Sequence, residues 1–183
     1  MDILKKPVLI AVIIAFSVIF AGLSLWKFGF SLTAAVCFLI FVDLMLISFA
    51  DITRQIIPNK LVIVLAALSI AWAALYRDAG ILHRIIGFFI LSVPMLTLTF
   101  FIKDAFGGGD IKLIAVCGFL LGFKLTLLTG FIAVILGGCC GFYLKYIRRK
   151  KDKHFPFGQY ICFGAFVSML CGNEIIRWYF NAI

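Results

Sequence analysis

The stretch FGFSLTAAVCFLIFVDLMLISFA, residues 28–50, decides the fold of this chain, because it runs for 23 residues with one charged side chain, Asp43. A membrane-spanning helix needs about 20 mainly apolar residues. The whole chain of 183 residues has the same character, with 64% hydrophobic and 14% charged residues. A soluble domain has about 25% charged residues, and a water-soluble protein of this size could not bury so much apolar surface. We therefore predict an integral membrane protein.

Seven stretches of this kind follow one another along the chain, at residues 8–26, 28–50, 61–76, 85–102, 113–123, 125–144 and 155–173. They predict an all-α polytopic membrane protein with about seven transmembrane helices. No repeat or separate soluble module interrupts them, so we expect a single transmembrane domain over residues 1–183. The long first stretch lacks a cleavage site of the signal-peptide type, which favours a retained first helix.

Basic residues predict the orientation, because cytoplasmic ends of membrane spans carry an excess of Lys and Arg. With a cytoplasmic N-terminus and seven crossings, twelve basic residues fall on the cytoplasmic side: Lys5, Lys6, Arg54, Lys60, Lys103, Lys112, Lys145, Arg148, Arg149, Lys150, Lys151 and Lys153. Five fall on the other side: Lys27, Arg77, Arg84, Lys124 and Arg177. We therefore expect a cytoplasmic N-terminus.

The fifth stretch is too short to cross a membrane alone, with only 11 residues between Lys112 and Lys124. If it did not cross, the basic cluster at residues 145–153 would move to the outer face, against the charge rule. Its helix must therefore begin upstream, which draws Asp110 and Lys112 to the membrane boundary. Charged groups at that depth need a wet cavity lined by protein.

Charge and cysteine patterns exclude other classes of function. The net charge of +9 comes from short clusters between apolar stretches, so we expect contacts with membrane lipids and none with nucleic acid. The six cysteines form no C-x-x-C pair, and the two histidines, His83 and His154, lie far apart. The sequence therefore predicts no metal site and no organic cofactor, and most of the cysteines are expected to be small buried hydrophobes.

Asp51 stands at the end of the second apolar stretch, in the run FADITRQIIPNK at residues 49–60. Pro58 cannot continue a helix from upstream and suits the first turn of the next one. The run is thus a short cytoplasmic connector with a carboxylate at its membrane edge. Position alone fits a water-exposed Asp at a helix end equally well.

Asp110 follows three glycines in the run FGGGDIK at residues 106–112. Glycine permits backbone conformations closed to other residues and the close approach of another chain. The Asp would also meet the positive end of the fifth helix's dipole. The alternative is a flexible loop with a helix-capping Asp.

Asp51 and Asp110 both fall at cytoplasmic ends of predicted spans. Two neighbouring carboxylates do not both ionise easily, so one keeps a proton while the other stays charged. Such a pair can activate a water molecule and protonate a leaving amide, as in aspartic proteases. Metalloprotease and serine-hydrolase motifs do not occur in the chain.

Three stretches together resemble the bacterial type IV prepilin peptidases, intramembrane aspartic proteases of the G-x-G-D class: Asp51 with Ile57-Pro58-Asn59, Gly107-Gly108-Gly109-Asp110-Ile111-Lys112-Leu113, and Pro156-Phe157-Gly158. The resemblance covers about residues 30–170. It implies that Asp51 and Asp110 are the catalytic pair and that the enzyme removes the basic leader peptide from prepilin-like or pseudopilin precursors. It further implies a location in the inner (cytoplasmic) membrane, lateral entry of the substrate helix, and cleavage at the cytoplasmic face. Residues expected to bind substrate or support the loops are Gly107, Gly108, Gly109, Lys112, Pro58 and Asn59.

The chain departs from the family pattern at two points. Many members carry an N-terminal region with two C-x-x-C pairs, associated with N-methylation of the product. This chain lacks that region, so we expect the short, peptidase-only form without methyltransferase activity. Where the family often has P-F-G-P, the last residue here is Gln159.

Two functions of other classes remain open from the sequence. A small transporter or proton-coupled channel would use Asp43, Asp51 and Asp110 as an ion path, but such a path needs acids spread through the bilayer, and two of the three cluster at one face. A non-catalytic assembly factor is disfavoured by the intact aspartate pair. Asp43 itself either pairs with a polar group of a neighbouring helix, which we favour, or lines the same cavity.

Overall fold

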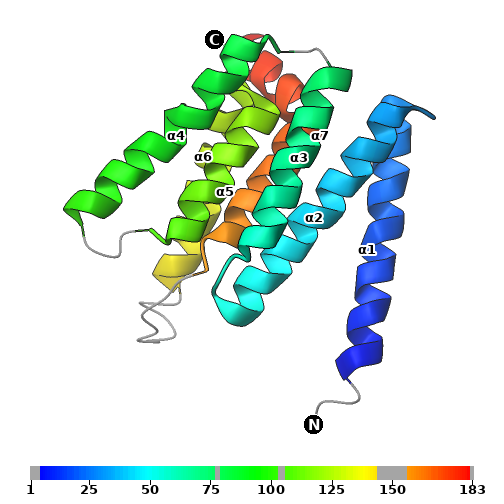
Figure 1. Cartoon of the computed structure of the whole chain (residues 1–183), viewed down its shortest axis with the longest axis horizontal. Helices are drawn as coiled ribbons and strands as arrows, with labels where there is room; N and C mark the ends of the chain where they lie inside the picture. Colours follow the sequence, from blue (N-terminus) through cyan, green and yellow to red (C-terminus); the bar gives the residue numbers. More distant parts are fainter. Residues whose placement is uncertain (1–4, 77–78, 103–105, 144–155, 182–183) are drawn as a thin grey trace.

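The computed structural model describes residues 5–76, 79–102, 106–143 and 156–181, with side chains from residue 16 onward. These residues form seven helices and no strand: α1 (Lys5–Phe28), α2 (Leu32–Arg54), α3 (Asn59–Leu75), α4 (Ile81–Phe101), α5 (Gly108–Leu121), α6 (Phe123–Phe142) and α7 (Gly158–Asn181). Successive helices run in opposite directions, so that α1 begins at one end of the bundle and α7 ends at the other (Figure 1). The prediction of an all-α polytopic membrane protein is confirmed.

Helix lengths distinguish the clear membrane spans from the shorter helices. Within the described part of the chain, α2, α4, α6 and α7 are long and apolar enough to cross a membrane. The α3 helix has 17 residues and α5 has 14. As predicted, α5 begins upstream of the fifth apolar stretch, at Gly108, and therefore includes Asp110 and Lys112.

Several residues used to predict the orientation lie outside the described residues, namely Lys103, Arg77 and the cluster at residues 145–153. The cytoplasmic location of the N-terminus therefore stays a prediction. The alternating helix directions agree with an odd number of crossings (Figure 1).

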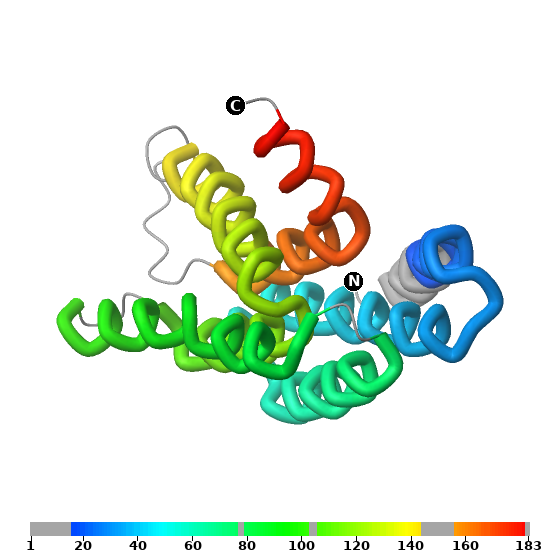
Figure 2. Tube along the Cα trace, turned by 90° about the horizontal axis from the view of Figure 1, so that it is seen from above, coloured from blue at the N-terminus to red at the C-terminus, as the bar shows by residue number. Residues whose placement is uncertain are grey.

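The α5 helix lies at the centre of the bundle and packs against α3, α4, α6 and α7 (Figure 2). Its contact with α4 is very close, because a Cβ atom at Gly118 would collide with the carbonyl oxygen of Gly87. Glycine at position 118 thus allows α4 and α5 to pack closely. At the other side of the bundle, α1 packs mainly on α2 and forms an edge (Figure 1).

Among the side chains that the structure describes, Arg84 is the largest that is fully buried, with 1% of its surface exposed. Its Nη1 donates hydrogen bonds to the carbonyl oxygens of Phe119 (3.2 Å) and Leu120 (2.6 Å), and its Nη2 donates one to Tyr76 (3.0 Å). These carbonyls belong to the C-terminal ends of α5 and α3, where a cation is favourable. The sequence places Arg84 at the end of a span, but only the packing shows that it is buried between helices.

The cysteines differ in their burial within the bundle. Cys37, Cys117 and Cys162 are buried, whereas Cys139 and Cys171 are exposed on the surfaces of α6 and α7, two helices that are apolar enough to cross a membrane.

Candidate functional site

Three helix ends meet at one end of the bundle: the last turn of α2, the first turn of α5 and the first turn of α7. Asp51 lies in α2, four residues before the helix joins its left-handed C-terminal residue Gln55. Asp110 lies in the first turn of α5, whose N-cap is Gly107. Both side chains are buried, with exposed fractions of 4% for Asp51 and 8% for Asp110. The alternative of a water-exposed Asp51 is therefore wrong. Asp110 belongs to the first turn of α5 and not to a flexible loop, and the N-cap position itself is held by Gly107.

The two carboxylates face the same point beside Gly158, the first residue of α7. A Cβ atom at Gly158 would lie 2.9 Å from Asp51 Oδ2 and 3.1 Å from Asp110 Oδ1. Since both oxygens lie so near one point, they are within about 6 Å of each other, a range over which two carboxylates affect each other's ionisation. The geometry thus brings together the two aspartates that the sequence singled out.

The N-terminal end of α7 holds Asp51. The backbone N–H of Gln159 donates a hydrogen bond to Asp51 Oδ2 at 3.1 Å, and the side chain of Gln159 donates from Nε2 to the carbonyl oxygen of Pro156 at 3.3 Å. A hydrogen bond from a helix N-terminus stabilises a negatively charged carboxylate. Asp51 therefore has a fixed position and a donor suited to its ionised form.

Small residues and Ile57 line the floor of the site. A Cβ atom at Gly109 would lie 3.0 Å from Ile57 Cβ, and one at Gly158 would lie 2.8 Å from Ile57 Cδ1. Gly107 is similarly close to Asp110, with 3.1 Å from its would-be Cβ to Oδ2. Gly108, in contrast, has open space around it. A side chain at Gly158 would therefore force Ile57 or Asp51 to move, and side chains at Gly107 and Gly109 would be tightly packed against Asp110 and Ile57.

Pro58, Asn59 and Lys112, which were predicted to bind substrate or support the loops, lie at the starts of α3 and α5. Pro58 is the N-cap of α3, and Asn59 is the first residue of that helix. The Lys112 Nζ, which is exposed, donates to Asn59 Oδ1 at 3.3 Å. Lys112 therefore links the start of α5 to the start of α3.

Asp43 lies two turns deeper in α2 and is 4% exposed. Among the described residues its Oδ2 has no hydrogen-bond partner. The favoured prediction, a polar partner on a neighbouring helix, is therefore not met for this oxygen. The described residues also contain no group of three or more His, Cys, Asp and Glu side chains placed to hold a metal ion.

The sequence showed Ile57, Gly158 and Gln159 only as parts of the family motifs, and no site role was predicted for them. The motif Pro156-Phe157-Gly158 was the available signal, but it predicts only the start of a helix. Which carboxylate the helix start contacts depends on the placement of α7 against α2, and no local pattern contains that information.

Comparison with known proteins finds a family and several relatives of this chain. The sequence model of the Type IV leader peptidase family matches residues 38–142, which include both Asp51 and Asp110. The prepilin leader peptidase/N-methyltransferase of Bacillus subtilis (strain 168) is 32% identical over 158 residues, which cover 84% of this chain and 62% of that protein. The proteins of the same name from Legionella pneumophila and Pseudomonas aeruginosa are 29% and 28% identical and cover 84% and 87% of this chain.

The chain spans 56% of the length of the Legionella protein and 57% of that of the Pseudomonas protein. No solved structure matches the chain.

Proposed function

Because this chain belongs to the type IV leader peptidase family, we propose that it is an intramembrane aspartic endopeptidase that removes the basic leader peptide from type IV prepilin-like or pseudopilin precursors. The names of its relatives support this substrate class. Family membership also favours a peptidase over a transporter or a proton-coupled channel.

The juxtaposition of Asp51 and Asp110 carries the proposal. These side chains come from helices separated by more than fifty residues of sequence, yet two of their oxygens lie about 3 Å from one point beside Gly158. Burying two like charges side by side is unfavourable for folding. A pair of carboxylates that shares a proton is, in contrast, what aspartic-protease chemistry needs.

The hydrogen bond from α7 supports different roles for the two carboxylates. Asp51, which accepts the Gln159 N–H, is the ionised base that takes a proton from water. The resulting hydroxide attacks the carbonyl carbon of the scissile peptide bond. Asp110 is the acid whose proton goes to the leaving amide nitrogen as the carbon–nitrogen bond breaks. The proton taken up by Asp51 then restores the starting state by exchange within the pair and with solvent.

We place the site at the cytoplasmic face of the inner membrane. The predicted excess of basic residues at this end of the bundle supports that orientation. There, a basic leader would remain in the cytoplasm while the apolar segment of the precursor lies in the bilayer. The proposal covers the peptidase step, and glycines 107–109, Pro58, Asn59 and Lys112 serve in it as supports of the site.

The decisive experiment co-expresses a type IV prepilin with the wild-type protein or with Asp51→Asn or Asp110→Asn at matched membrane levels. Each variant is expected to lower the rate of leader removal at least ~100-fold, the typical contribution of a general acid or base. Asp43→Asn is the matched control, because Asp43 is an equally buried carboxyl group of α2 outside the pair.

Loss of cleavage in both pair variants, with cleavage kept in Asp43→Asn, is the expected result. Cleavage that survives in Asp51→Asn or Asp110→Asn removes that residue from the mechanism. Absence of cleavage by the wild-type protein would argue against prepilins as its substrates.

A further inference from the structure

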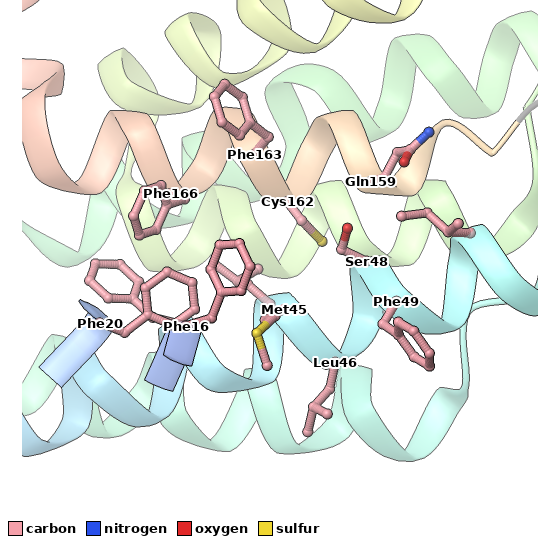
Figure 3. A pocket seen from close by; sticks show the side chains of 13 residues that line it. Phe16, Phe20, Met45, Leu46, Ser48, Phe49, Gln159, Cys162, Phe163 and Phe166 are labelled. Carbon is pink, nitrogen blue, oxygen red and sulfur yellow. The ribbon is translucent and has the colours of Figure 1, made fainter. Parts of the chain in front are cut away.

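A groove of about 380 Å³ lies between α1, α2 and α7 and opens to the side of the bundle. Its walls include Phe16 of α1, Met45 and Phe49 of α2, and Phe163 of α7. Figure 3 shows Ser48 and Cys162 between the ribbons of α2 and α7, in the middle of this groove. The groove residues Phe16, Phe49 and Phe163 are exposed, so the groove is open at the surface that faces the bilayer.

One end of the groove adjoins the carboxylate pair. Ile52, which lines the groove, directly follows Asp51 in α2. Gln159 also lines it, and the backbone N–H of the same residue donates to Asp51 Oδ2. A chain lying in the groove would therefore end beside the two aspartates.

The other end is closed by three aromatic rings in the middle of the bundle. Phe20, Phe41 and Phe166 contact one another with ring centroids 4.8–5.7 Å apart. From Phe41 to Ile52, α2 rises by about 16 Å, the length of about three helical turns. The groove is thus as long as a short helical segment that starts at the aspartates and reaches about half the depth of a bilayer.

The groove lining selects apolar ligands. None of the residues that line it carries a charge, and only Ser48 and Gln159 have polar side chains that form hydrogen bonds readily. Met45 adds a flexible wall that adapts to ligands of different shape. A basic leader peptide does not suit such a lining, but an apolar helix does.

We propose that this groove holds the first three turns of the apolar helix that follows the leader in the precursor, so that the leader junction lies between Asp51 and Asp110. The inference rests on the proposed peptidase function and adds where the substrate binds. Continuity with the aspartates favours the precursor over a lipid acyl chain, which would have no reason to end at a buried carboxylate pair. The leader itself lies beyond Ile52, outside the groove.

Photo-crosslinking tests the occupant directly. Phe163 is replaced by benzoylphenylalanine in the Asp110→Asn background, which keeps the precursor uncleaved, and a full-length type IV prepilin is the probe. Phe131 of α6 is the matched control, because it is a similarly exposed phenylalanine (64% against 52%) that does not line the groove. An adduct with the apolar segment of the prepilin at position 163 and none at 131 is expected. Adducts with lipid alone at 163, or equal prepilin adducts at both positions, would overturn the inference.

Filling the groove tests its importance for cleavage. Ser48→Trp is expected to lower kcat/KM for the prepilin at least tenfold, mainly through KM, because the groove binds the substrate and the aspartates remain in place. Ala35→Trp introduces the same side chain at an exposed position of the same helix and is expected to cleave at the wild-type rate.

The two proposals fail in different ways. If the wild-type protein does not cleave the prepilin, the peptidase function fails. If the wild-type protein cleaves it and Ser48→Trp cleaves it with an unchanged KM, the peptidase function stands and the groove is not the binding site.

Discussion

A buried charged side chain lies at each end of the central helix α5, Arg84 of α4 at one end and Asp110 of α5 itself at the other, but the two have different surroundings. At the C-terminal end, Arg84 is surrounded by three carbonyl oxygens of α3 and α5, which carry partial negative charge. At the N-terminal end, Asp110 lies beside a second carboxylate, Asp51, and one described hydrogen bond from α7 holds that partner. A buried charge costs free energy unless opposite charge or hydrogen bonds compensate it. The contacts of Arg84 at the C-terminal end thus stabilise the fold. The pair of aspartates at the N-terminal end is unfavourable for stability but suits catalysis.

This difference separates the effects expected from mutation. Changes at the Arg84 end should lower the free energy of unfolding, and through it the amount of folded protein. Changes beside the aspartates should affect the rate of leader cleavage more than the thermal stability.

The largest effect on stability is expected for Arg84→Gln. The substitution removes a charged donor and leaves buried carbonyl oxygens without a partner, which should cost about 3 kcal/mol of unfolding free energy. Thermal unfolding in detergent micelles measures the change. Arg177→Gln is the control, because Arg177 is exposed on α7. Equal melting temperatures for the two variants would contradict the role assigned to Arg84.

A smaller loss of stability is expected for Gly118→Ala. The added methyl group would meet the Gly87 carbonyl and force α4 and α5 apart, at a cost of about 1–3 kcal/mol. Gly138→Ala is the matched control in α6, since that glycine has open space around it. There the change should stabilise the helix by about 0.5–1 kcal/mol. If thermal unfolding shows that both variants are more stable than the wild-type protein, the α4–α5 contact can relax around the added methyl group.

Gly158→Ala tests the end of the bundle at which Asp51 and Asp110 meet. The methyl group would enter the space between Asp51 Oδ2 and Asp110 Oδ1 and displace one of them. We expect prepilin cleavage to fall about tenfold, which corresponds to about 1.4 kcal/mol in the activation free energy. The effect on the cleavage rate should exceed the effect on the melting temperature. Gly22→Ala, which adds a methyl group in open space on α1, should leave cleavage unchanged. An unchanged cleavage rate in Gly158→Ala would mean that the carboxylates do not need this space.

The smallest effect is expected for Gln159→Pro. Proline removes the N–H that donates to Asp51 but is tolerated in the first turn of a helix. Cleavage should fall by a few-fold, since the rest of α7 and the aspartate pair remain. Gln159→Ala keeps the backbone donor, so a comparison of the two rates separates the N–H from the side chain. A larger loss in Gln159→Ala than in Gln159→Pro would show that the side chain matters more.

Local sequence was enough to single out the two aspartates, whereas the contacts around them depend on packing. Asp51 and Asp110 stood out because a carboxylate beside a long apolar stretch costs free energy when it lies in the membrane, and such residues are usually functional. Ile57, Gly158 and Gln159 appeared only as motif residues without a predicted contact, because an isoleucine, a glycine and a glutamine are ordinary residues in a loop or a helix start. Their importance comes from the close approach of α5 and α7 to the α2–α3 connector.

The same reasoning explains Arg84, which the sequence presents only as one more basic residue between two apolar stretches. Its burial depends on the ends of α3 and α5, which lie together with the start of α4 only in the folded bundle.

The sequence by itself determined the all-helical membrane fold, the number of helices, the early start of α5 and the two aspartates at one end, because apolar length and charge position are local properties. Only the tertiary structure decided that the aspartates meet beside Gly158, that α7 holds Asp51, and that a groove between α1, α2 and α7 leads to them. The physical reason is that these features depend on how helix surfaces fit together. That fit is set by side-chain shape and close backbone contact between segments far apart in the chain.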